Sequence, residues 1–348
     1  MEKIVKYPIG QQDFKTLRER GDLYVDKTRY LQTVLNSSQY LFLARPRRFG
    51  KSLFLSTLRY FFEGRRDLFK GLYIDTIERD WTPNPVLHFD LNQERYAEPG
   101  VLDRVADNMF HDWEVKYDID VKSDDLSIRF RNIIKGAHEK TGKQVVILVD
   151  EYDKPLVGNL NEMENFEHYR SKLAAIYSNF KSSAEHIRLV FLTGVSRFSK
   201  LSVFSDLNNL NDITFDNEYA DICGITEREL FDSFHIGIKK LAENYSLSYD
   251  KAASLLKRNY DGYRFAAKGS DIYNPWSLLN CLAKSDIGNY WNGTGRPTLI
   301  VEALKRINAD LQSYFNSTCS DDELRGLDLL DPQPLALLYQ TGYLTIKD

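Results

Sequence analysis

Four short apolar runs alternate with segments of helical periodicity along the first two hundred residues of the chain. The runs lie near residues 41, 87, 147 and 191, and residues 145–149 are five consecutive branched apolar side chains. Such a continuous run is typical of a strand in a parallel sheet that helices cover on both faces. The pattern therefore predicts an α/β fold, an αβα sandwich with a parallel central sheet.

The segments between these runs carry helix signals. Apolar side chains recur at helical spacing over residues 54–62, and Gly64 is placed to end that helix. A helical stretch is expected from residue 101 to about residue 137, and shorter helices are expected from Asp13 and after residues 24–28. Strands and helices thus alternate, as a covered parallel sheet requires.

The connection from the first apolar run to the helix that follows it has the sequence Arg-Pro-Arg-Arg-Phe-Gly-Lys-Ser, residues 45–52. Strand, tight loop and helix form the context of a phosphate-binding loop, in which backbone N–H groups at the helix start converge on an anion. Lys51 is placed to reach the outer phosphates and Ser52 to bind Mg²⁺. The alternative is a basic loop that caps a helix. The nucleotide contacts predicted from this loop are Pro46, Arg47, Arg48, Phe49, Gly50, Lys51, Ser52 and Leu53.

The loop departs from the usual pattern at its first position, where Arg45 stands in place of glycine. Pro46 biases the residue before it towards an extended conformation. We therefore expect the strand to run one residue longer and the loop to turn on residues 46–50.

Two carboxylates, Asp150 and Glu151, directly follow the third apolar run. Open α/β sheets bind their ligands at the carboxyl ends of the strands. Asp150 is predicted to hold Mg²⁺ through water, and Glu151 to orient and deprotonate the attacking water. Both could instead cap the next helix, but a Gly-Lys-Ser loop at the same predicted sheet edge favours the nucleotide site. A strand between Lys51 and Asp150, with Glu151 next, indicates the ATPase branch that has an added strand and a glutamate base.

The fourth apolar run ends in a polar residue, Thr193, which is the candidate sensor of the γ-phosphate or of the lytic water, with Ser196 second. Arg197 is predicted to reach phosphate, in this subunit or a neighbouring one, as an arginine finger does. A surface ion pair explains Arg197 equally well. The segment from Arg197 to Thr214 is rich in Asn, Asp and Ser and predicts an exposed loop near the site.

Composition limits the classes of partner. The 348 residues carry 46 basic and 50 acidic side chains, so the net charge of −4 draws no nucleic acid to the whole protein. Positive charge is concentrated in residues 45–66, which suits a polyphosphate better than a nucleic-acid backbone. Three cysteines without metal spacing, no signal peptide and no apolar run of membrane-spanning length predict a cytoplasmic protein.

The pattern changes near residue 220. Thr226 and Glu229 form a predicted capping box that opens a helix, a second helix contains residues 255–256, and a third starts at Asn274 after a turn at residues 260–263. These signals predict a small helical or winged-helix lid, for which plain packing is at least as good an explanation as DNA binding. The expected units are a P-loop ATPase core with its N-terminal segment (1–218), the lid (219–300) and a C-terminal helix and strand segment (301–348).

Eight motifs along the chain resemble those of the bacterial AAA-ATPase-like proteins, which are related to archaeal and STAND-type ATPases. The resemblance covers essentially the whole chain and implies that arginine at position 45 is the usual form in this group. The motifs are Pro8-Ile9-Gly10, Tyr24-Val25-Asp26-Lys27-Thr28, RPRRFGKS, ILVDEYDKP, FLTGVSRFS, YDGYRF, YNPWSLLN and LLYQTGYLTI.

The resemblance also implies the ligand and a further domain. N-terminal segments of related ATPases fold over the adenine, so Asp26, Lys27 and Thr28 are expected near the base or ribose, although Asp26 or Thr28 could equally cap a helix. The motifs do not decide between adenine and guanine, because no Asn-Lys-x-Asp motif stands out. ATP is preferred on the resemblance and on its abundance. In this group a restriction-endonuclease-like domain commonly follows. Residues 341–346 alternate and predict a strand that leads onward, but no nuclease motif appears, so a shortened form is expected.

Two functions remain open at this point. One is Mg²⁺-dependent ATP hydrolysis coupled to a partner, an oligomer or an effector domain. The other is a nucleotide-dependent switch or DNA-associated module with little hydrolysis. Glu151 favours hydrolysis, because a pure binder has little need of a base there. DNA contact is expected to be weak and salt-sensitive, through Arg47, Arg48 and the lid.

Overall fold

The computed structural model describes residues 5–195, 203, 207, 209–291, 318–320, 323–324 and 333–346. In this part of the chain, five parallel strands form the central sheet in the order β2-β3-β4-β1-β5. All four predicted strands are therefore present. The strands are β1 (Tyr40–Ala44), β2 (Val86–Asp90), β3 (Val145–Asp150), β4 (Ile187–Gly194) and β5 (Asn211–Asp212).

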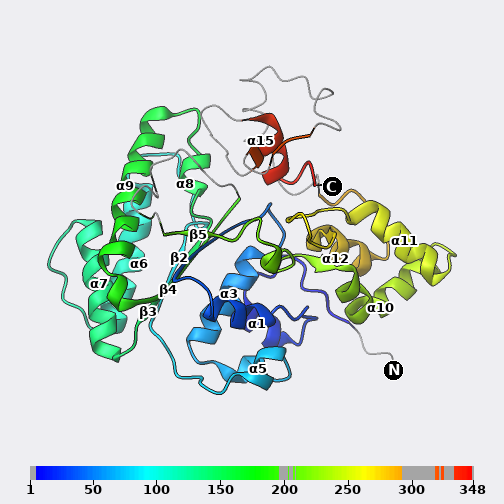
Figure 1. Cartoon of the computed structure of the whole chain (residues 1–348), viewed down its shortest axis with the longest axis horizontal. Coiled ribbons are helices and arrows are strands. Elements are labelled where there is room, and N and C mark those ends of the chain that lie inside the picture. Colours follow the sequence, from blue (N-terminus) through cyan, green and yellow to red (C-terminus); the bar gives the residue numbers. More distant parts are fainter. Residues whose placement is uncertain are drawn as a thin grey trace.

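Helices cover both faces of the sheet, as the apolar runs predicted (Figure 1). In β3, Val145, Ile147 and Val149 pack into one apolar core, and Val146 and Leu148 pack into the other. The first core is covered by α6 (Val101–Tyr117), α7 (Leu126–Thr141), α8 (Lys154–Val157) and α9 (Met163–Ser182). The second is covered by α1 (Phe14–Arg20), α2 (Arg29–Leu35), α3 (Lys51–Phe62), α4 (Arg66–Phe69) and α5 (Tyr73–Ile77).

Local signals fix the helix ends. Asp13 caps α1 by accepting a hydrogen bond from the Thr16 amide, and α3 ends before Gly64, as predicted. The predicted helical stretch of residues 101–137 is two helices, because Asp118 adopts a left-handed conformation (φ 53°) that stops α6. Short 3₁₀ turns are present at Ala184–His186 and Asn217–Tyr219.

A separate helical unit follows, with its own apolar core (Figure 1). Thr226 and Glu229 form the predicted capping box at its first helix. Nothing in the described part of this unit establishes the winged-helix alternative. Its elements are β6 (Ile225–Thr226), α10 (Glu227–Asn244), α11 (Tyr249–Tyr260), β7 (Ile272–Tyr273) and α12 (Pro275–Lys284), and β6 pairs with β7 in antiparallel orientation.

The segment before Thr214 was predicted as an exposed loop, and this is wrong for its described end. Residues 211–212 form β5 at the edge of the sheet, and Ile213 is buried. The Ile213 amide donates to the Phe42 carbonyl, and the Thr214 hydroxyl accepts a hydrogen bond from the Ala44 amide (3.0 Å). The polar composition misled because backbone groups of this segment, together with the Thr214 hydroxyl, bond to β1 and to Arg45.

The strand predicted for residues 341–346 is also absent. Helix α15 (Pro334–Gln340) ends there, and the chain turns at Gly342, whose φ is 88°. The amides of Tyr343 and Leu344 both donate to the Leu338 carbonyl, so they close the helix end in place of pairing with a strand. Among the described residues, no helix is both long and apolar enough to span a membrane.

Candidate functional site

The loop between β1 and α3 has the backbone of an anion site. Arg48 and Gly50 adopt left-handed conformations, with φ of 70° and 99°. The first intrahelical bond of α3 runs from the Phe54 amide to the Gly50 carbonyl, so the amides of the residues before Phe54 have no partner in the helix. Left-handed residues at the start of a helix turn successive N–H groups towards one concavity, where the helix dipole also favours negative charge.

Arg45, which replaces the usual first glycine, is a buried structural residue with 1% of its surface exposed. Its guanidinium donates to the carbonyls of Thr214 (2.7 Å) and Tyr219 (3.0 Å), and it lies 4.3 Å from the centre of the Phe265 ring. Burial lowers the pKa of Arg45. The arginine thus joins the loop to the segment after β5 and to the helical unit.

Lys51 is buried at the first position of α3. Its ammonium donates to the carbonyls of Arg45 (2.9 Å) and Pro46 (3.3 Å), which belong to the same loop. Ser52 is half-buried beside it, and Arg47 is exposed. The lysine is therefore held at the loop by carbonyls of the loop itself.

Two other loop side chains contact the helical unit. The Arg48 guanidinium stacks on the Trp276 ring at 3.8 Å, and the buried Phe49 ring packs edge-on against Tyr263 (4.9 Å). The Phe49 carbonyl also accepts a hydrogen bond from the Gly224 amide (2.9 Å). The conformation of the loop is consequently linked to the position of this unit.

The carboxylates after β3 lie at the same end of the sheet as the loop. This is because β4 lies between β1 and β3 and pairs with both in parallel orientation. Thr193, at the end of β4, donates from its hydroxyl to Asp150 Oδ1 (2.6 Å) and accepts from the Glu151 amide at 3.4 Å. Asp150 is buried, whereas Glu151 is half-buried with a left-handed φ of 51°. Thr193 therefore orients the Asp150 carboxylate and fixes the turn that carries Glu151.

The tip of β4 requires glycine. A Cβ at Gly194 would lie 2.6 Å from the Tyr152 ring, which is itself fully buried. The Gly194 carbonyl accepts a hydrogen bond from the Arg45 amide (3.2 Å), and Asp153 accepts one from the Val195 amide (3.1 Å). Close packing here joins the loop, β4 and the turn after β3 into one rigid edge.

A largely apolar cavity of about 90 Å³ lies beside the loop. Gly50 and Leu53 line it from the loop and α3, and Tyr24 and Lys27 line it from the N-terminal segment. The helical unit closes it with Ile222, Cys223, Gly224, Ile225, Phe234, Pro275 and Leu279. A flat apolar group bound next to the loop would fit between these three segments.

Of the three N-terminal residues predicted near a base, only Lys27 lines this cavity. The Asp26 carboxylate accepts from the amides of Thr28 (2.8 Å) and Tyr73 (2.7 Å), and the Thr28 hydroxyl accepts from the Ile74 amide (3.1 Å). Asp26 and Thr28 thus hold the start of α5, a helix distant in sequence, whereas Thr28 makes no side-chain cap bond to α2, the helix that follows it.

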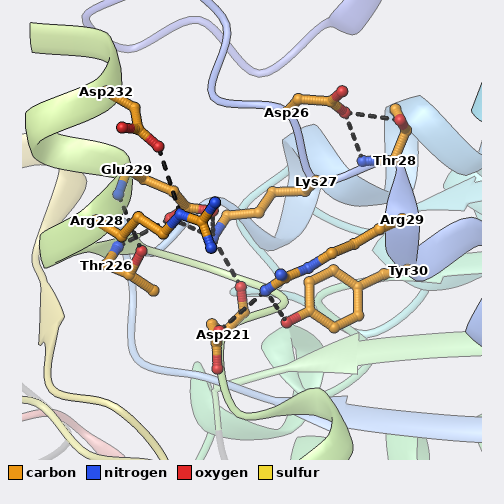
Figure 2. A network of polar contacts seen from close by, with 10 residues as sticks. All are labelled: Asp26, Lys27, Thr28, Arg29, Tyr30, Asp221, Thr226, Arg228, Glu229 and Asp232. Carbon is orange, nitrogen blue, oxygen red and sulfur yellow. Dashed lines mark hydrogen bonds and ion pairs between the residues drawn. The ribbon is translucent and has the colours of Figure 1, made fainter. Parts of the chain in front are cut away.

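Lys27 joins the N-terminal segment to the helical unit (Figure 2). Its ammonium bonds both oxygens of Glu229 at 2.7 Å and the Asp221 carbonyl at 2.8 Å. Burial lowers the pKa of Lys27, and the nearby Glu229 carboxylate opposes that shift. Arg29 adds an ion pair with Asp221 (2.9 Å). Two cations of the N-terminal segment thus contact the first turn of α10 and the residues before it.

Sequence reasoning missed several residues of this region. Asp90 stands beside Asp150 in the register of β2 and β3, and its position at a strand end was the available signal. The contacts of Arg45, Gly194 and Trp276 depend on segments distant in sequence, so no local pattern could reveal them. Ser196 and Arg197 lie outside the described residues.

The fold and the loop define a P-loop-like α/β sandwich. The family model described as "Predicted AAA-ATPase" (AAA-ATPase_like) matches residues 8–204, and the chain belongs to this family. The chain is 37% identical over 343 residues to a protein of Azotobacter chroococcum mcd 1 named "Uncharacterized protein in vnfD 5'region". That match covers 98% of this chain and 64% of the relative, so the chain spans less than two thirds of the relative's length. No solved structure matches the chain.

Proposed function

We propose that the protein binds Mg²⁺–ATP at the edge formed by β1, β4 and β3 and hydrolyses it. The observation that carries this proposal is the strand order, in which β4 separates the Lys51 loop from the strand that ends in Asp150 and Glu151. This order brings an anion-binding loop and two carboxylates to one edge, as ATP hydrolysis requires.

The phosphates would bind to the amides of residues 47–53 and to the Lys51 ammonium. Ser52 and Asp150 would hold Mg²⁺. The donor set fits a hard cation, because both groups offer oxygen ligands and Asp150 accepts the Thr193 hydroxyl at Oδ1, which leaves its other oxygen for the ion. Held by these residues, Mg²⁺ would supply positive charge that offsets the negative charge of the phosphates.

The base would occupy the cavity between the N-terminal segment, the loop and the helical unit. The apolar walls of this cavity suit a purine, and Lys27 is a charged residue among those that line it. We assign ATP on the family resemblance, since no residue of this cavity dictates adenine over guanine. Asp26 and Thr28 contribute through α5 and the shape of the segment, without touching the base.

For hydrolysis, Glu151 would accept a proton from water as the water oxygen attacks the γ-phosphorus and ADP leaves. Thr193 would act through Asp150, to which its hydroxyl is bonded. Arg197 stays a prediction for a phosphate contact. The nucleotide state would reach a partner or an effector domain through the helical unit, which contacts the loop at Phe49 and Arg48.

Nucleotide binding is tested by calorimetry on the Lys51→Ala variant. Charge-assisted bonds to phosphate contribute about 1.5–3 kcal/mol each, so the affinity for Mg²⁺–ATP should fall on the order of tenfold to a hundredfold. Lys70→Ala, which removes an exposed lysine outside the site, is the matched control and should bind normally. Equal affinity of Lys51→Ala and wild type would reject the site.

Hydrolysis is tested by phosphate release from the Glu151→Gln variant. The variant should bind nucleotide normally and release phosphate about 10²–10⁴-fold more slowly than wild type. If wild type is as slow as Glu151→Gln while both bind ATP, the protein is a nucleotide-dependent switch and hydrolysis is not its function.

A further inference from the structure

The loop between β1 and α3 contains a backbone conformation that its sequence does not favour. Arg48 is left-handed, with a φ of 70°, as is Gly50 two residues later. Glycine adopts this conformation freely, whereas the Cβ of an arginine comes too close to the following carbonyl oxygen. A residue with a side chain stays in this region only where its surroundings hold it there. The contacts of the Arg48 side chain therefore bear on the anion-binding shape of the loop.

The Arg48 side chain extends from the loop to the helical unit. Its guanidinium carbon lies 3.8 Å from the centre of the Trp276 ring. At this distance a cation is attracted to the face of an indole, which is the aromatic ring that binds cations best. Burial lowers the pKa of Arg48, and the charge of Arg47 lowers it further. The ring face compensates the charged guanidinium in this position, so it favours the backbone conformation that brings the side chain there.

The Trp276 indole is itself fixed by its neighbours. Its Nε1–H donates to the Tyr290 carbonyl (3.1 Å). Trp276 belongs to the first turn of α12, whose start is set by the cap that the Asn274 side chain provides. The turn at Gly10 lies against the ring, because a Cβ at Gly10 would be 3.6 Å from Trp276 Cζ3. The ring is thus a fixed platform to which the N-terminal segment and α12 both contribute.

The next residue of the loop is held by the same unit. Phe49 is 1% exposed, and its ring packs against Tyr263 (4.9 Å) and Phe265 (5.1 Å). Its carbonyl accepts a hydrogen bond from the Gly224 amide (2.9 Å). Two consecutive loop residues, Arg48 and Phe49, are therefore bound to the helical unit, just before the amides at the start of α3.

We propose that Trp276 is a positioning residue for the nucleotide site. By holding the Arg48 guanidinium, Trp276 keeps Arg48 left-handed, and the loop amides then stay turned towards the phosphates. This inference rests on the proposed function of the loop and deepens it. Arg48 acts on the phosphates through its backbone, and its side chain links the affinity of the loop to the helical unit. The motif YNPWSLLN, which contains Trp276, gains its role in this way.

The first test is calorimetric titration of a non-hydrolysable Mg²⁺–ATP analogue into two variants of the full chain. Glycine is left-handed without steric cost, so Arg48→Gly should bind within about threefold of wild type although it lacks the guanidinium. Arg48→Ala keeps the Cβ and loses the stacking, so its affinity should fall about threefold to tenfold. A guanidinium that bonded a phosphate directly would instead give losses of similar size in both variants.

The same titration tests Trp276. Trp276→Leu should weaken binding about threefold to tenfold, and Trp276→Tyr, which keeps an aromatic face, should restore most of the affinity. In the Arg48→Gly background, Trp276→Leu should change the affinity by less than about twofold, because a glycine does not need the ring. Trp81→Leu is the matched control. It removes a half-buried indole that packs on Phe61 (5.2 Å), near the other end of α3, so it should lose stability in urea and bind the analogue as wild type does.

The outcomes separate this inference from the nucleotide site. No binding of the analogue by wild type would reject the site and the positioning role together. Binding by wild type, with equal affinity of Arg48→Gly and Arg48→Ala, would overturn the positioning role and leave the site intact. The same holds if Trp276→Leu binds as wild type does, or if its loss persists in full in the Arg48→Gly background. Circular dichroism verifies that each variant is folded, and the Arg48 pair decides the matter if Trp276→Leu does not fold.

Discussion

At the scale of single residues, Arg45 shows how a position can keep its place in a motif and change its function. The usual glycine gives the loop freedom, whereas this arginine supplies three hydrogen bonds to carbonyls of the chain. The anion-binding geometry is then provided by left-handed residues later in the loop, Arg48 and Gly50.

Restoring glycine at this position should therefore destabilise the protein. Arg45→Gly removes a buried cation and leaves the carbonyls of Thr214 and Tyr219 without their donor, which should cost about 2–4 kcal/mol. Urea unfolding followed by circular dichroism measures the loss. Arg47→Gly, at an exposed neighbour in the same loop, is the control for added backbone freedom and should cost about 1 kcal/mol or less. Equal losses would contradict the structural role of Arg45.

A second prediction concerns Asp261 and the dependence of the protein's stability on pH. Burial raises the pKa of Asp261; Asp271 and Glu227 raise it further, and Lys257 and the Gly262 amide oppose them. A raised carboxyl pKa means that the folded state loses stability as pH rises from the unfolded value, near 3.8, through the folded one. Asp261→Asn should thus raise the melting temperature at neutral pH.

The gain from Asp261→Asn should be largest at neutral pH and should shrink as the pH falls towards 4. Thermal unfolding of the variant and of wild type over this range gives the difference. A variant less stable than wild type at pH 7 would show that the Asp261 carboxylate has a structural partner.

At the scale of elements, the ion pair between Lys27 and Glu229 joins the N-terminal segment to α10 (Figure 2). A double-mutant cycle with Lys27→Met and Glu229→Gln should give a coupling energy of about 1–3 kcal/mol, because both groups are largely buried. Glutamine at the third helical position still supports the capping box, so the helix start is retained.

The matched control is on the same helix. Arg228 and Asp232 form an exposed pair four residues apart, with side chains 91% and 68% exposed. The same cycle with Arg228→Gln and Asp232→Asn should give about 0.5 kcal/mol or less. Comparable coupling in the two cycles would mean that burial does not strengthen the Lys27 pair.

The elements also show what the sequence could predict. Strands β1 to β4 were predictable because each is an apolar run, and α10 because its capping box lies within four residues. Strand β5 was not, since it is two polar residues long and is held by β1, a distant segment. In the site, Lys51, Asp150 and Glu151 follow from motif and position, whereas the bond from Thr193 to Asp150 depends on the pairing of strands and becomes visible only in the fold.

At the scale of the whole molecule, the helical unit contacts the sandwich at the loop and at the N-terminal segment. Three contacts lie at this junction: Arg48 stacks on Trp276, Phe49 packs against Tyr263, and Lys27 pairs with Glu229. If the proposed nucleotide moves the loop, we expect the contacts of Arg48 and Phe49 with the helical unit to change.

The distribution of charge on the molecule bears on whether the protein binds DNA. Positive charge concentrated in residues 45–66 suggested a contact with phosphates, but most of these side chains have other partners in the fold. Arg45 is buried and Lys51 bonds carbonyls of its own loop. Of the remainder, Arg59 pairs with Glu63, Arg65 with Asp67 and Arg66 with Asp75.

We therefore expect weak, salt-sensitive DNA binding that involves few phosphates. Each phosphate contact contributes about −0.9 to the slope of log affinity against log salt, so the slope should be no steeper than about −2. Fluorescence anisotropy with a short labelled duplex at several salt concentrations measures it, and Arg47→Ala should make the slope shallower by about 1. Glu323→Gln, at an exposed carboxylate far along the chain, is the control for a change in net charge. A slope near −6, with binding that persists at moderate salt, would show that the helical unit is a DNA-binding surface, because the paired arginines of residues 45–66 cannot supply six contacts.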